Sequence, residues 1–353
     1  MAVPFRSIDT AVRPGRKQIA FDQALVDLHI DGVVPDTLRF LRFPPTVLVG
    51  RHQAISREVK IDYCSANGVG LARRITGGGA IYLDENQVGW ELVLSRRRLP
   101  MSDLAAYTVA ICEAVACGLS EVFSIPASHR PRSDIVVDGQ KICGTGGYFD
   151  GDTLIYQGTV LVDIDTAGIM ACLNVPDVKP ASRELDMAER RMTTLKSLLG
   201  SAPSVGQVHQ ALIQGLEGRL GIAIEPGSIS QREEDLARKY GEEYIETDAF
   251  VFEIDAPSRQ GFVSASRMCP GGRLDLFLRL EGEGDARRVR EILLTGDFFV
   301  TPPRAVFDLE AKLRGVQVNQ IEQMVDDYFA RTKFDLITIT ADDLKDTLTQ
   351  ACS

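Results

Sequence analysis

Three consecutive glycines constrain this chain more than any other local feature. Gly77, Gly78 and Gly79 follow the paired arginines Arg73 and Arg74 in the stretch Arg-Arg-Ile-Thr-Gly-Gly-Gly-Ala. Each glycine in ordered backbone costs about 0.5–1 kcal/mol relative to alanine, so a triplet is an unfavourable way to build an ordinary turn. Without Cβ atoms the three amides can approach a phosphate or carboxylate, to which the arginines can add charge. We therefore predict a loop that binds an anionic ligand, in preference to a tight hairpin with two solvated arginines.

A second glycine-rich stretch, residues 138–147, contains a single lysine, Lys141, between apolar and small neighbours. The residues 135–142 read as a strand, an Asp-Gly turn and a second strand. This pattern places Lys141 at the start of a strand, where a cation is held more rigidly than on a loop. The first glycine stretch has neither the Gly-Lys-Ser/Thr of a Walker loop nor the spacing of a dinucleotide-binding fold.

The periodicity of apolar residues predicts a mixed α/β (α+β) chain. Apolar stripes at helical spacing predict helices, and short apolar runs predict strands. The predicted helices of the first part cover 17–30, 102–122 and 205–220, and strands 37–43 and 46–49 are expected to form a hairpin around Pro44-Pro45.

A polar and charged segment at about 226–244 is interpreted as a linker between domains 1–225 and 245–353. Within it, Ser230 and Glu233 have the spacing of a capping box, and Gly241 is expected to stop the helix. The smaller second domain is predicted to be α+β. Its expected elements are strands 274–280 and 289–294, a helix opened by Pro302-Pro303 and closed by Gly315, and helices 317–330 and 341–351.

Composition indicates an ordinary globular protein. The 353 residues are 44% hydrophobic and 25% charged, with a net charge of −10 that argues against nucleic acid as a partner. The sequence contains neither a signal-peptide pattern nor an apolar run long enough to cross a bilayer, so we expect a cytoplasmic monomer without a membrane partner. The seven cysteines lack framework spacing and are expected to be reduced.

Together these segments resemble the lipoate-protein ligases of the biotin/lipoate protein ligase superfamily. The resemblance covers about residues 15–200 and continues into a C-terminal accessory domain. It is carried by the motifs at 50–53, 73–84, 133–137, 141–146, 156–163 and 191–195, and for the accessory domain by those at 271–274, 295–299 and 309–310.

The resemblance implies an ATP-dependent reaction in two steps. Lipoate and ATP, with Mg²⁺, give lipoyl-adenylate, which then acylates a lysine of a lipoyl-carrier protein; no cofactor is permanently bound. The carrier would be a dehydrogenase E2 lipoyl domain, a glycine-cleavage H-like protein or a lipoate-binding protein. Lys141 would be the catalytic cation between the lipoate carboxylate and the α-phosphate. The residues implied to bind lipoate or adenylate are Arg73, Arg74, Thr76, Gly77, Gly78, Gly79, Ala80, Tyr82, Asp134, Gly144, Thr145, Gly146, Gly158 and Thr159.

Two assignments stay open at this point. Asp134 matches a family residue near the nucleotide or its metal, and a strand-capping acid is an equal interpretation. The motif Gln87-Val88-Gly89-Trp90 resembles the octanoyl transferases as much as the ligases. An octanoyl transferase would use a cysteine as acyl carrier. Cys143 and Cys172 are the candidate nucleophiles, although a free cysteine more often acts as a small buried hydrophobe.

Overall fold

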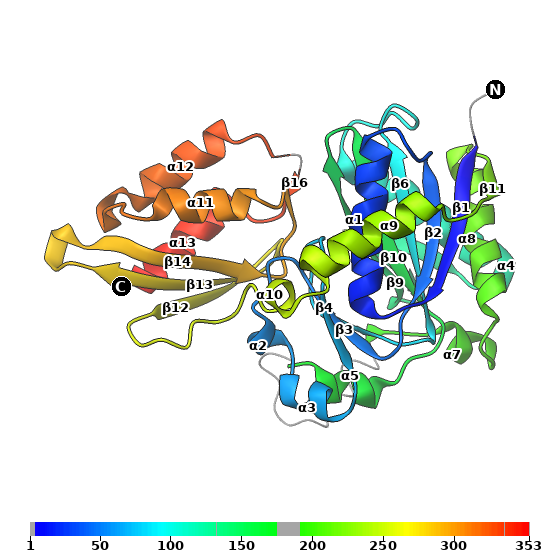
Figure 1. Ribbon diagram of the computed structural model, residues 1–353, viewed down its shortest axis with the longest axis horizontal. Coiled ribbons are helices and arrows are strands. Elements are labelled where there is room, and N and C mark those ends of the chain that lie inside the picture. Colours follow the sequence, from blue (N-terminus) through cyan, green and yellow to red (C-terminus); the bar gives the residue numbers. More distant parts are fainter. Residues whose placement is uncertain (1–3, 132, 175–190, 335, 353) are drawn as a thin grey trace. The chain divides into compact units, whose positions relative to one another are not determined.

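The computed structural model describes residues 4–131, 133–174, 191–334 and 336–352, which form two compact units (Figure 1). The first unit comprises Met1–Leu48, Val59–Arg73 and Ile81–Val251, and the second comprises Val49–Glu58, Arg74–Ala80 and Phe252–Ser353. The second unit therefore contains two short segments that lie far from the rest of it in sequence. Each unit is described by itself below.

A mixed eight-stranded sheet forms the centre of the first unit. Its strand order is β11-β1-β2-β6-β10-β9-β8-β7, with β1 parallel to both of its neighbours and the remaining pairs antiparallel. The strands are β1 (Phe5–Val12), β2 (Thr37–Arg42), β6 (Gln87–Ser95), β7 (Ala127–Arg130), β8 (Asp134–Val137), β9 (Gln140–Asp150), β10 (Thr153–Leu161) and β11 (Ile224–Pro226). The predicted mixed-sheet fold is confirmed.

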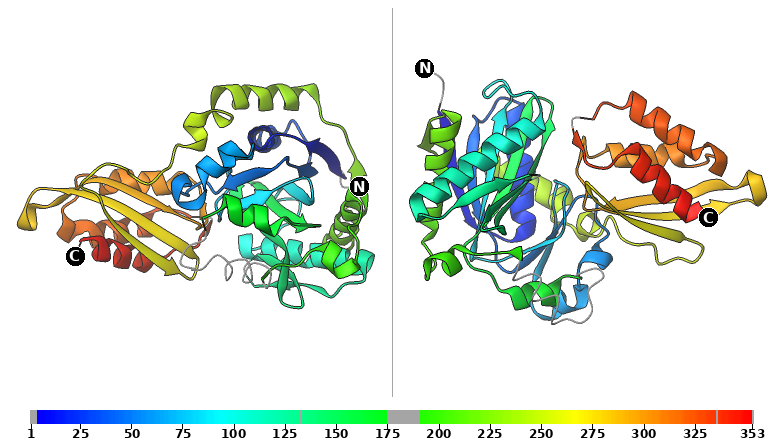
Figure 2. Two further views of the ribbon diagram at one scale, coloured as in Figure 1. Left: turned by 90° about the horizontal axis from the view of Figure 1, so that it is seen from below. Right: turned by 180° about the vertical axis from the view of Figure 1, so that it is seen from behind.

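Helices cover both faces of this sheet (Figure 2). The pair α1 (Gly15–Ile30) and α9 (Gln231–Tyr240) lies on one face, and α4 (Leu104–Phe123) with α8 (Val205–Leu220) lies on the other. The apolar stripe predicted for α1 is buried, including Phe21 and Leu25, which are fully inaccessible. In the described part of the chain, α4 alone is long and apolar enough to meet the length and composition test for a membrane span, a test that buried core helices also pass. Half of its apolar window is buried within the protein.

The hairpin predicted around Pro44-Pro45 is wrong. Strand β2 pairs with β1 and β6, whereas β3 (Thr46–Val49) belongs to a separate three-stranded sheet with β4 (Gly70–Arg73) and β5 (Ile81–Leu83). Proline cannot donate a backbone hydrogen bond, and each proline also holds the residue before it extended. The two prolines therefore carry the chain from one sheet to the next instead of reversing it.

The capping box is present, and Gly241 does not stop the helical backbone. Ser230 Oγ accepts from Glu233 N, and Glu233 in turn accepts from Ser230 N. Gly241 has a φ of −59°, and the chain continues through a π-helical turn, Gly241–Ile245, to α10 (Asp248–Val251). Short helices α3 (Ile61–Ala66), α5 (Thr166–Cys172) and α7 (Leu195–Leu199) complete the described part of the first unit.

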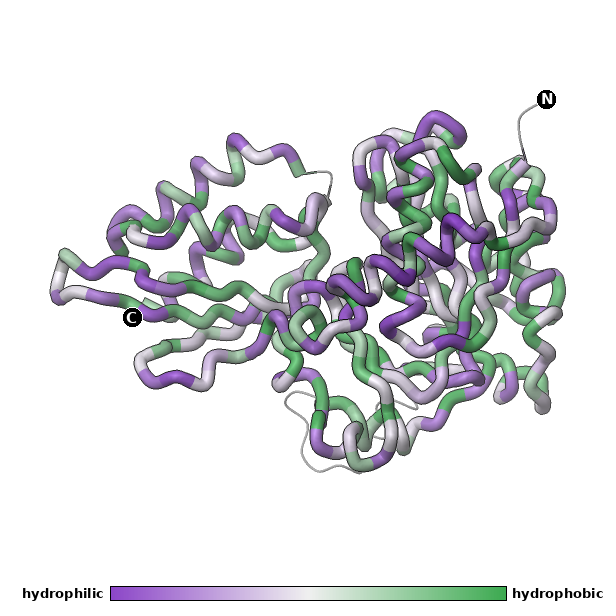
Figure 3. Tube along the Cα trace, viewed as in Figure 1, coloured by the Kyte–Doolittle hydropathy of each residue, from purple (hydrophilic) through white to green (hydrophobic). Residues whose placement is uncertain are grey.

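The second unit packs helices against a three-stranded antiparallel sheet. Leu274, Leu276 and Leu278 of the central strand are buried in its core, and Figure 3 shows hydrophobic stretches along the strands of this unit. The elements are β12 (Val263–Cys269), β13 (Gly272–Glu281), β14 (Arg288–Gly296), β15 (Val300–Thr301), α11 (Ala305–Leu313), α12 (Ile321–Arg331), β16 (Leu336–Ile337), α13 (Ala341–Cys352) and, from the early segment, α2 (Ile55–Glu58). The strands and helices predicted for this part of the sequence are confirmed.

Candidate functional site

A β-bulge determines where the Lys141 side chain points. Strands β8 and β9 are joined by a turn in which Asp138 and Gly139 both have positive φ, 49° and 79°, as a two-residue hairpin turn of this kind requires. The register pairs Val136 with Lys141 but Ile135 with Cys143, so Ile142 is an extra residue on β9. In a regular strand Lys141 and Gly144 would face opposite sides of the sheet; the bulge brings them to the same side.

Lys141 lies in a cluster of charges on that side. Its Nζ is 2.8 Å from Asp134 Oδ1, and the other oxygen of Asp134 lies 2.5 Å from Arg130 Nη2. Burial raises the pKa of the Asp134 carboxyl, but Lys141 and Arg130 outweigh this and hold the pKa below its ordinary value. The result is an ionised carboxylate between two cations, on a surface that remains partly accessible.

Small residues surround the lysine. A Cβ on Gly144 would lie 2.5 Å from Lys141 Nζ, so the side chain crosses directly over that glycine. Beyond it, Thr145 Oγ1 donates to Ser133 O at 2.9 Å and contacts the hydroxyl of Tyr156 at 2.7 Å. The structure thus brings together four of the predicted site residues, Lys141, Asp134, Gly144 and Thr145.

Three further predicted residues follow along β9 and β10. Gly146 lies opposite Gln157, and Thr159 lies opposite Gly144 and is partly exposed. Gly158 has a packing reason of its own, because a Cβ there would lie 2.4 Å from Cζ2 of the buried Trp90.

The motif 191–195 lies beside the lysine. Met192 forms a parallel bridge with Lys141, and Thr193 N donates to Lys141 O at 2.9 Å. Thr194 caps α7 by accepting from Ser197 N. This segment therefore fixes the backbone of Lys141 from the side opposite β8.

The glycine loop belongs to the second unit, where it packs against the segment that joins β14 to β15. A Cβ on Gly77 would lie 2.6 Å from Phe298 O, and one on Gly78 would lie 2.8 Å from Phe299 Cζ. Gly78 has a φ of +93°, and its amide donates to Phe298 O at 3.4 Å. Gly79 lies near Asp297. Close backbone approach is thus a physical requirement for Gly77 and Gly78, and the contact of the three glycines with a ligand stays a prediction.

The two arginines before the loop have different environments. Arg73, in the first unit, is fully buried, and its Nε donates to the carbonyls of Phe250 and Val251. Arg74 Nη2, in the second unit, donates to the carbonyls of Gly77 and Gly79 at 3.0 and 2.8 Å. Arg74 therefore shapes the loop, and a contact of either arginine with a ligand stays a prediction.

The remaining predicted residues of this stretch are divided between the units. Thr76 and Ala80 belong to the second unit, where Thr76 O accepts from Arg51 N at 2.9 Å. Tyr82 belongs to the first unit, in β5 opposite Val47. Burial raises the pKa of its hydroxyl to about 12.

The candidate nucleophilic cysteines are buried. Burial raises the pKa of Cys143 to about 12, and it also raises the pKa of Cys172 and of Cys112, whose sulfur lies 3.3 Å from Thr145 Oγ1. All three thiols belong to the most inaccessible part of the first unit, with exposed fractions of 0 to 1%. A nucleophilic thiolate needs a lowered pKa and access for the acyl group, and neither condition is met at these positions.

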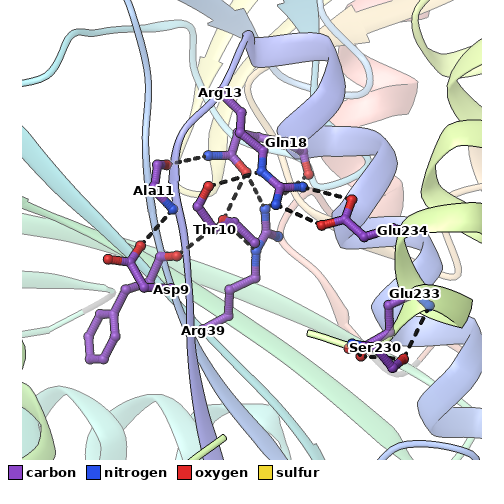
Figure 4. Close-up of polar contacts among 10 residues, drawn as sticks. Asp9, Thr10, Ala11, Arg13, Gln18, Arg39, Ser230, Glu233 and Glu234 are labelled. Carbon is purple, nitrogen blue, oxygen red and sulfur yellow. Dashed lines mark hydrogen bonds and ion pairs between the residues drawn. The ribbon is translucent and has the colours of Figure 1, made fainter. Parts of the chain in front are cut away.

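A row of polar residues, of which Arg39 and Glu91 are fully buried and Gln157 is partly buried, crosses the sheet under α1 and was not predicted from the sequence. Arg39, Glu91 and Gln157 are consecutive cross-strand partners on β2, β6 and β10. Figure 4 shows Arg39 with Gln18 and Thr10, whose oxygens lie 2.6 and 3.2 Å from the guanidinium nitrogens. Burial raises the pKa of Glu91 to about 8, with Asp22 adding to the effect. The sequence signal that could have indicated this row is a polar residue between apolar neighbours in each of the three strands.

A metal site is not evident in the described residues. Among them, no group of three or more His, Cys, Asp and Glu side chains is arranged to hold a metal ion. Both oxygens of Asp134, the residue considered for Mg²⁺, are engaged by cations. Asp134 as it stands therefore does not fit the role of a magnesium ligand.

The chain belongs to a known family. Residues 14–217 match the family model described as the lipoyl protein ligase A/B catalytic domain, which confirms the resemblance seen in the sequence. Octanoyltransferase LipM of Symbiobacterium thermophilum is 29% identical over 269 residues, which cover 68% of this chain and 97% of that protein. About a third of the present chain therefore has no counterpart in that transferase.

Solved structures of ligases are also similar. A bi-partite lipoate protein ligase from Thermoplasma acidophilum, described together with its E2 lipoyl domain, is 26% identical with a TM-score of 0.64 and covers 73% of this chain and 100% of that chain. A lipoate-protein ligase A bound with ATP is 26% identical with a TM-score of 0.61 and covers 71% of this chain and 99% of that one. LipL1 of P. falciparum, in complex with lipoate, is 16% identical with a TM-score of 0.75, covers 98% of this chain and 99% of that chain, and shows the fold alone.

Proposed function

We propose that this protein is an ATP-dependent lipoate-protein ligase, which forms lipoyl-adenylate and transfers the lipoyl group to a lysine of a lipoyl-carrier protein. The observation that carries this proposal is the burial of the two candidate nucleophilic thiols. Cys143 and Cys172 are buried with raised pKa, so an acyl group on sulfur would have to form in the packed interior. An adenylate needs no such nucleophile.

Lys141 supplies the charge that adenylate formation needs. Lipoate and the α-phosphate are both anionic, and a cation held between them offsets a repulsion that grows as they approach. A preorganised donor of this kind is typically worth about 3–4 kcal/mol of barrier. The bulge and the bridge to Met192 fix the backbone of Lys141, and its ammonium is paired with Asp134.

The second unit also supports a ligase. The octanoyltransferase relative is almost fully covered by about two thirds of this chain, so its length leaves little room for a unit of this size. The Thermoplasma ligase is bi-partite, and we propose that the C-terminal unit here supplies in one chain what a second component supplies there.

Octanoyl transfer to the same class of acceptor is the second candidate, and the names of several relatives favour it. Such an enzyme would take its acyl group from a carrier-protein thioester and would need no ATP. In both cases the partner would be a lipoyl-carrier protein such as an E2 lipoyl domain, an H-like protein or a lipoate-binding protein, and the location would be cytoplasmic.

Pyrophosphate release separates the two candidates. Purified protein is given ATP, Mg²⁺ and lipoate, and we expect lipoate-dependent release that persists in Cys143→Ser and Cys172→Ser. Lys141→Ala should abolish release, whereas Lys196→Ala, which removes a lysine 2.7 Å from Asp163 in the same unit, should not. Absence of release, together with cysteine-dependent transfer from an octanoyl-carrier protein, would establish the transferase instead.

A further inference from the structure

Arg130 is a charged residue beside the catalytic lysine to which the proposed chemistry gives no role. It ends β7 and lies directly opposite Asp134 in the antiparallel register with β8. Its Nη2 contacts Asp134 Oδ2 at 2.5 Å, and its Nη1 donates to Gly139 O at 3.2 Å. One guanidinium therefore contacts both the partner of Lys141 and the turn that leads into the strand carrying Lys141.

The arrangement divides one carboxylate between two cations. In the described part of the chain, the ion pairs of Asp134 are with Lys141 through Oδ1 and with Arg130 through Oδ2. Asp134 is the most buried of the three, with 24% of its side chain exposed against 37% for Lys141 and 45% for Arg130. A partly buried carboxylate that loses its partner is strongly disfavoured.

This matters because Lys141 has to change partners during turnover. Its ammonium lies on Asp134 in the structure, whereas activation of an acid requires it to lie on substrate oxygens. Moving the ammonium away breaks the contact with Oδ1. The contact between Oδ2 and Arg130 does not involve Lys141 and can persist through the exchange.

We propose that Arg130 is a positioning residue that retains the Asp134 carboxylate while Lys141 exchanges this partner for an anionic oxygen of the substrate. The inference rests on the proposed function in one respect, namely that Lys141 binds an anionic substrate. With Arg130 present, Asp134 stays paired before and after the exchange. Without Arg130, Lys141 is the remaining ion-pair partner of the carboxylate among the described residues, and it is held back from the substrate.

A kinetic double-mutant cycle tests whether Arg130 acts through Asp134. We expect Arg130→Gln to raise the KM for lipoate by up to about fivefold with a smaller change in kcat. Added to Asp134→Asn, the same substitution should change the kinetics by less than about twofold, because no carboxylate is left to retain. Arg130→Lys keeps a cation and should restore most of the loss. Arg97→Gln, which removes an arginine 2.7 Å from Asp152 on the same unit, is the matched control and should have no effect.

A labelling experiment gives a readout that needs no activity. Limited acetylation with acetic anhydride, followed by mass spectrometry, measures how available the Lys141 amine is, with Lys196 as the internal reference. Labelling of Lys141 should be several-fold slower in Arg130→Gln, where Lys141 no longer shares Asp134, and faster in Asp134→Asn.

The two experiments have separate consequences. If pyrophosphate release fails but Lys141 labelling responds as stated, the ligase proposal falls and the role of Arg130 stands. Unchanged labelling in Arg130→Gln would overturn the role of Arg130 whatever the reaction is. An equal kinetic loss in the Asp134→Asn background would also overturn it, since Arg130 would then act directly on the substrate or on the fold.

Discussion

Gly144→Ala is expected to impair catalysis while leaving the fold intact. The new Cβ would lie 2.5 Å from Lys141 Nζ and 2.6 Å from its Cε, where ordinary contact needs at least 3.4 Å. The ammonium must therefore retreat by about 1 Å, and a misplacement of this size at a reacting centre can cost about 10²-fold in rate. Because the obstructed atoms are the end of a flexible side chain, stability should change by no more than about 0.5 kcal/mol.

The assay is lipoate-dependent pyrophosphate release beside a thermal unfolding curve. Gly206→Ala, in α8, is the matched control because nothing lies within 4 Å of its added Cβ. Full activity of Gly144→Ala would refute the reasoning that Lys141 acts from its place over this glycine. A large loss of stability would show that the glycine is needed for the sheet itself.

Three other predictions concern the buried and loop residues. Glu91→Gln should stabilise the protein at pH 8 but hardly at pH 5. The pKa of Glu91 is raised from 4.5 to about 8, so between these pH values the carboxyl ionises only in the unfolded chain. The free energy of unfolding of the wild type therefore falls by about 1.4 kcal/mol per pH unit in this range. Equal effects at both pH values in urea unfolding would contradict this. Gly78→Val should prevent lipoate binding, measured calorimetrically, and should destabilise the second unit by at least about 1–2 kcal/mol. The reason is that Gly78 has a φ of +93° and that Phe299 Cζ would lie 2.8 Å from the new Cβ. Unaltered lipoate binding would show that the loop is purely structural. Cys143→Ser and Cys172→Ser should each keep at least about half of the activity, since neither thiol is expected to carry the acyl group; loss of transfer with normal folding would restore the cysteine mechanism.

Local chemistry made much of the fold predictable from the sequence. The Asp138-Gly139 pair needed two positive φ values, and the structure has them at that turn. The capping box at Ser230 was similarly evident, because its three-residue spacing is a local signal.

What could not be predicted depended on non-local pairing. Nothing near Pro44-Pro45 indicated that β2 and β3 would join different sheets. Each strand's sheet is determined by its partners, which are β1 and β6 for β2 and include β5 for β3. The bulge at Ile142 is equally hidden, since it comes from the register with β8. The motifs singled out Lys141, whose catalytic role stays a prediction, but they did not indicate that strand pairing would place Asp134 and Arg130 beside it.

The discontinuous second unit also has a consequence for how the protein is made. A ribosome delivers Val49–Glu58 and Arg74–Ala80 long before Phe252–Ser353, yet these segments belong to one compact unit. During synthesis the glycine loop has no Phe298 or Phe299 to pack against. The contacts of the loop with Phe298 and Phe299 can form only once the last third of the chain has emerged, so a polypeptide terminated before that point contains Gly77, Gly78 and Gly79 without these contacts.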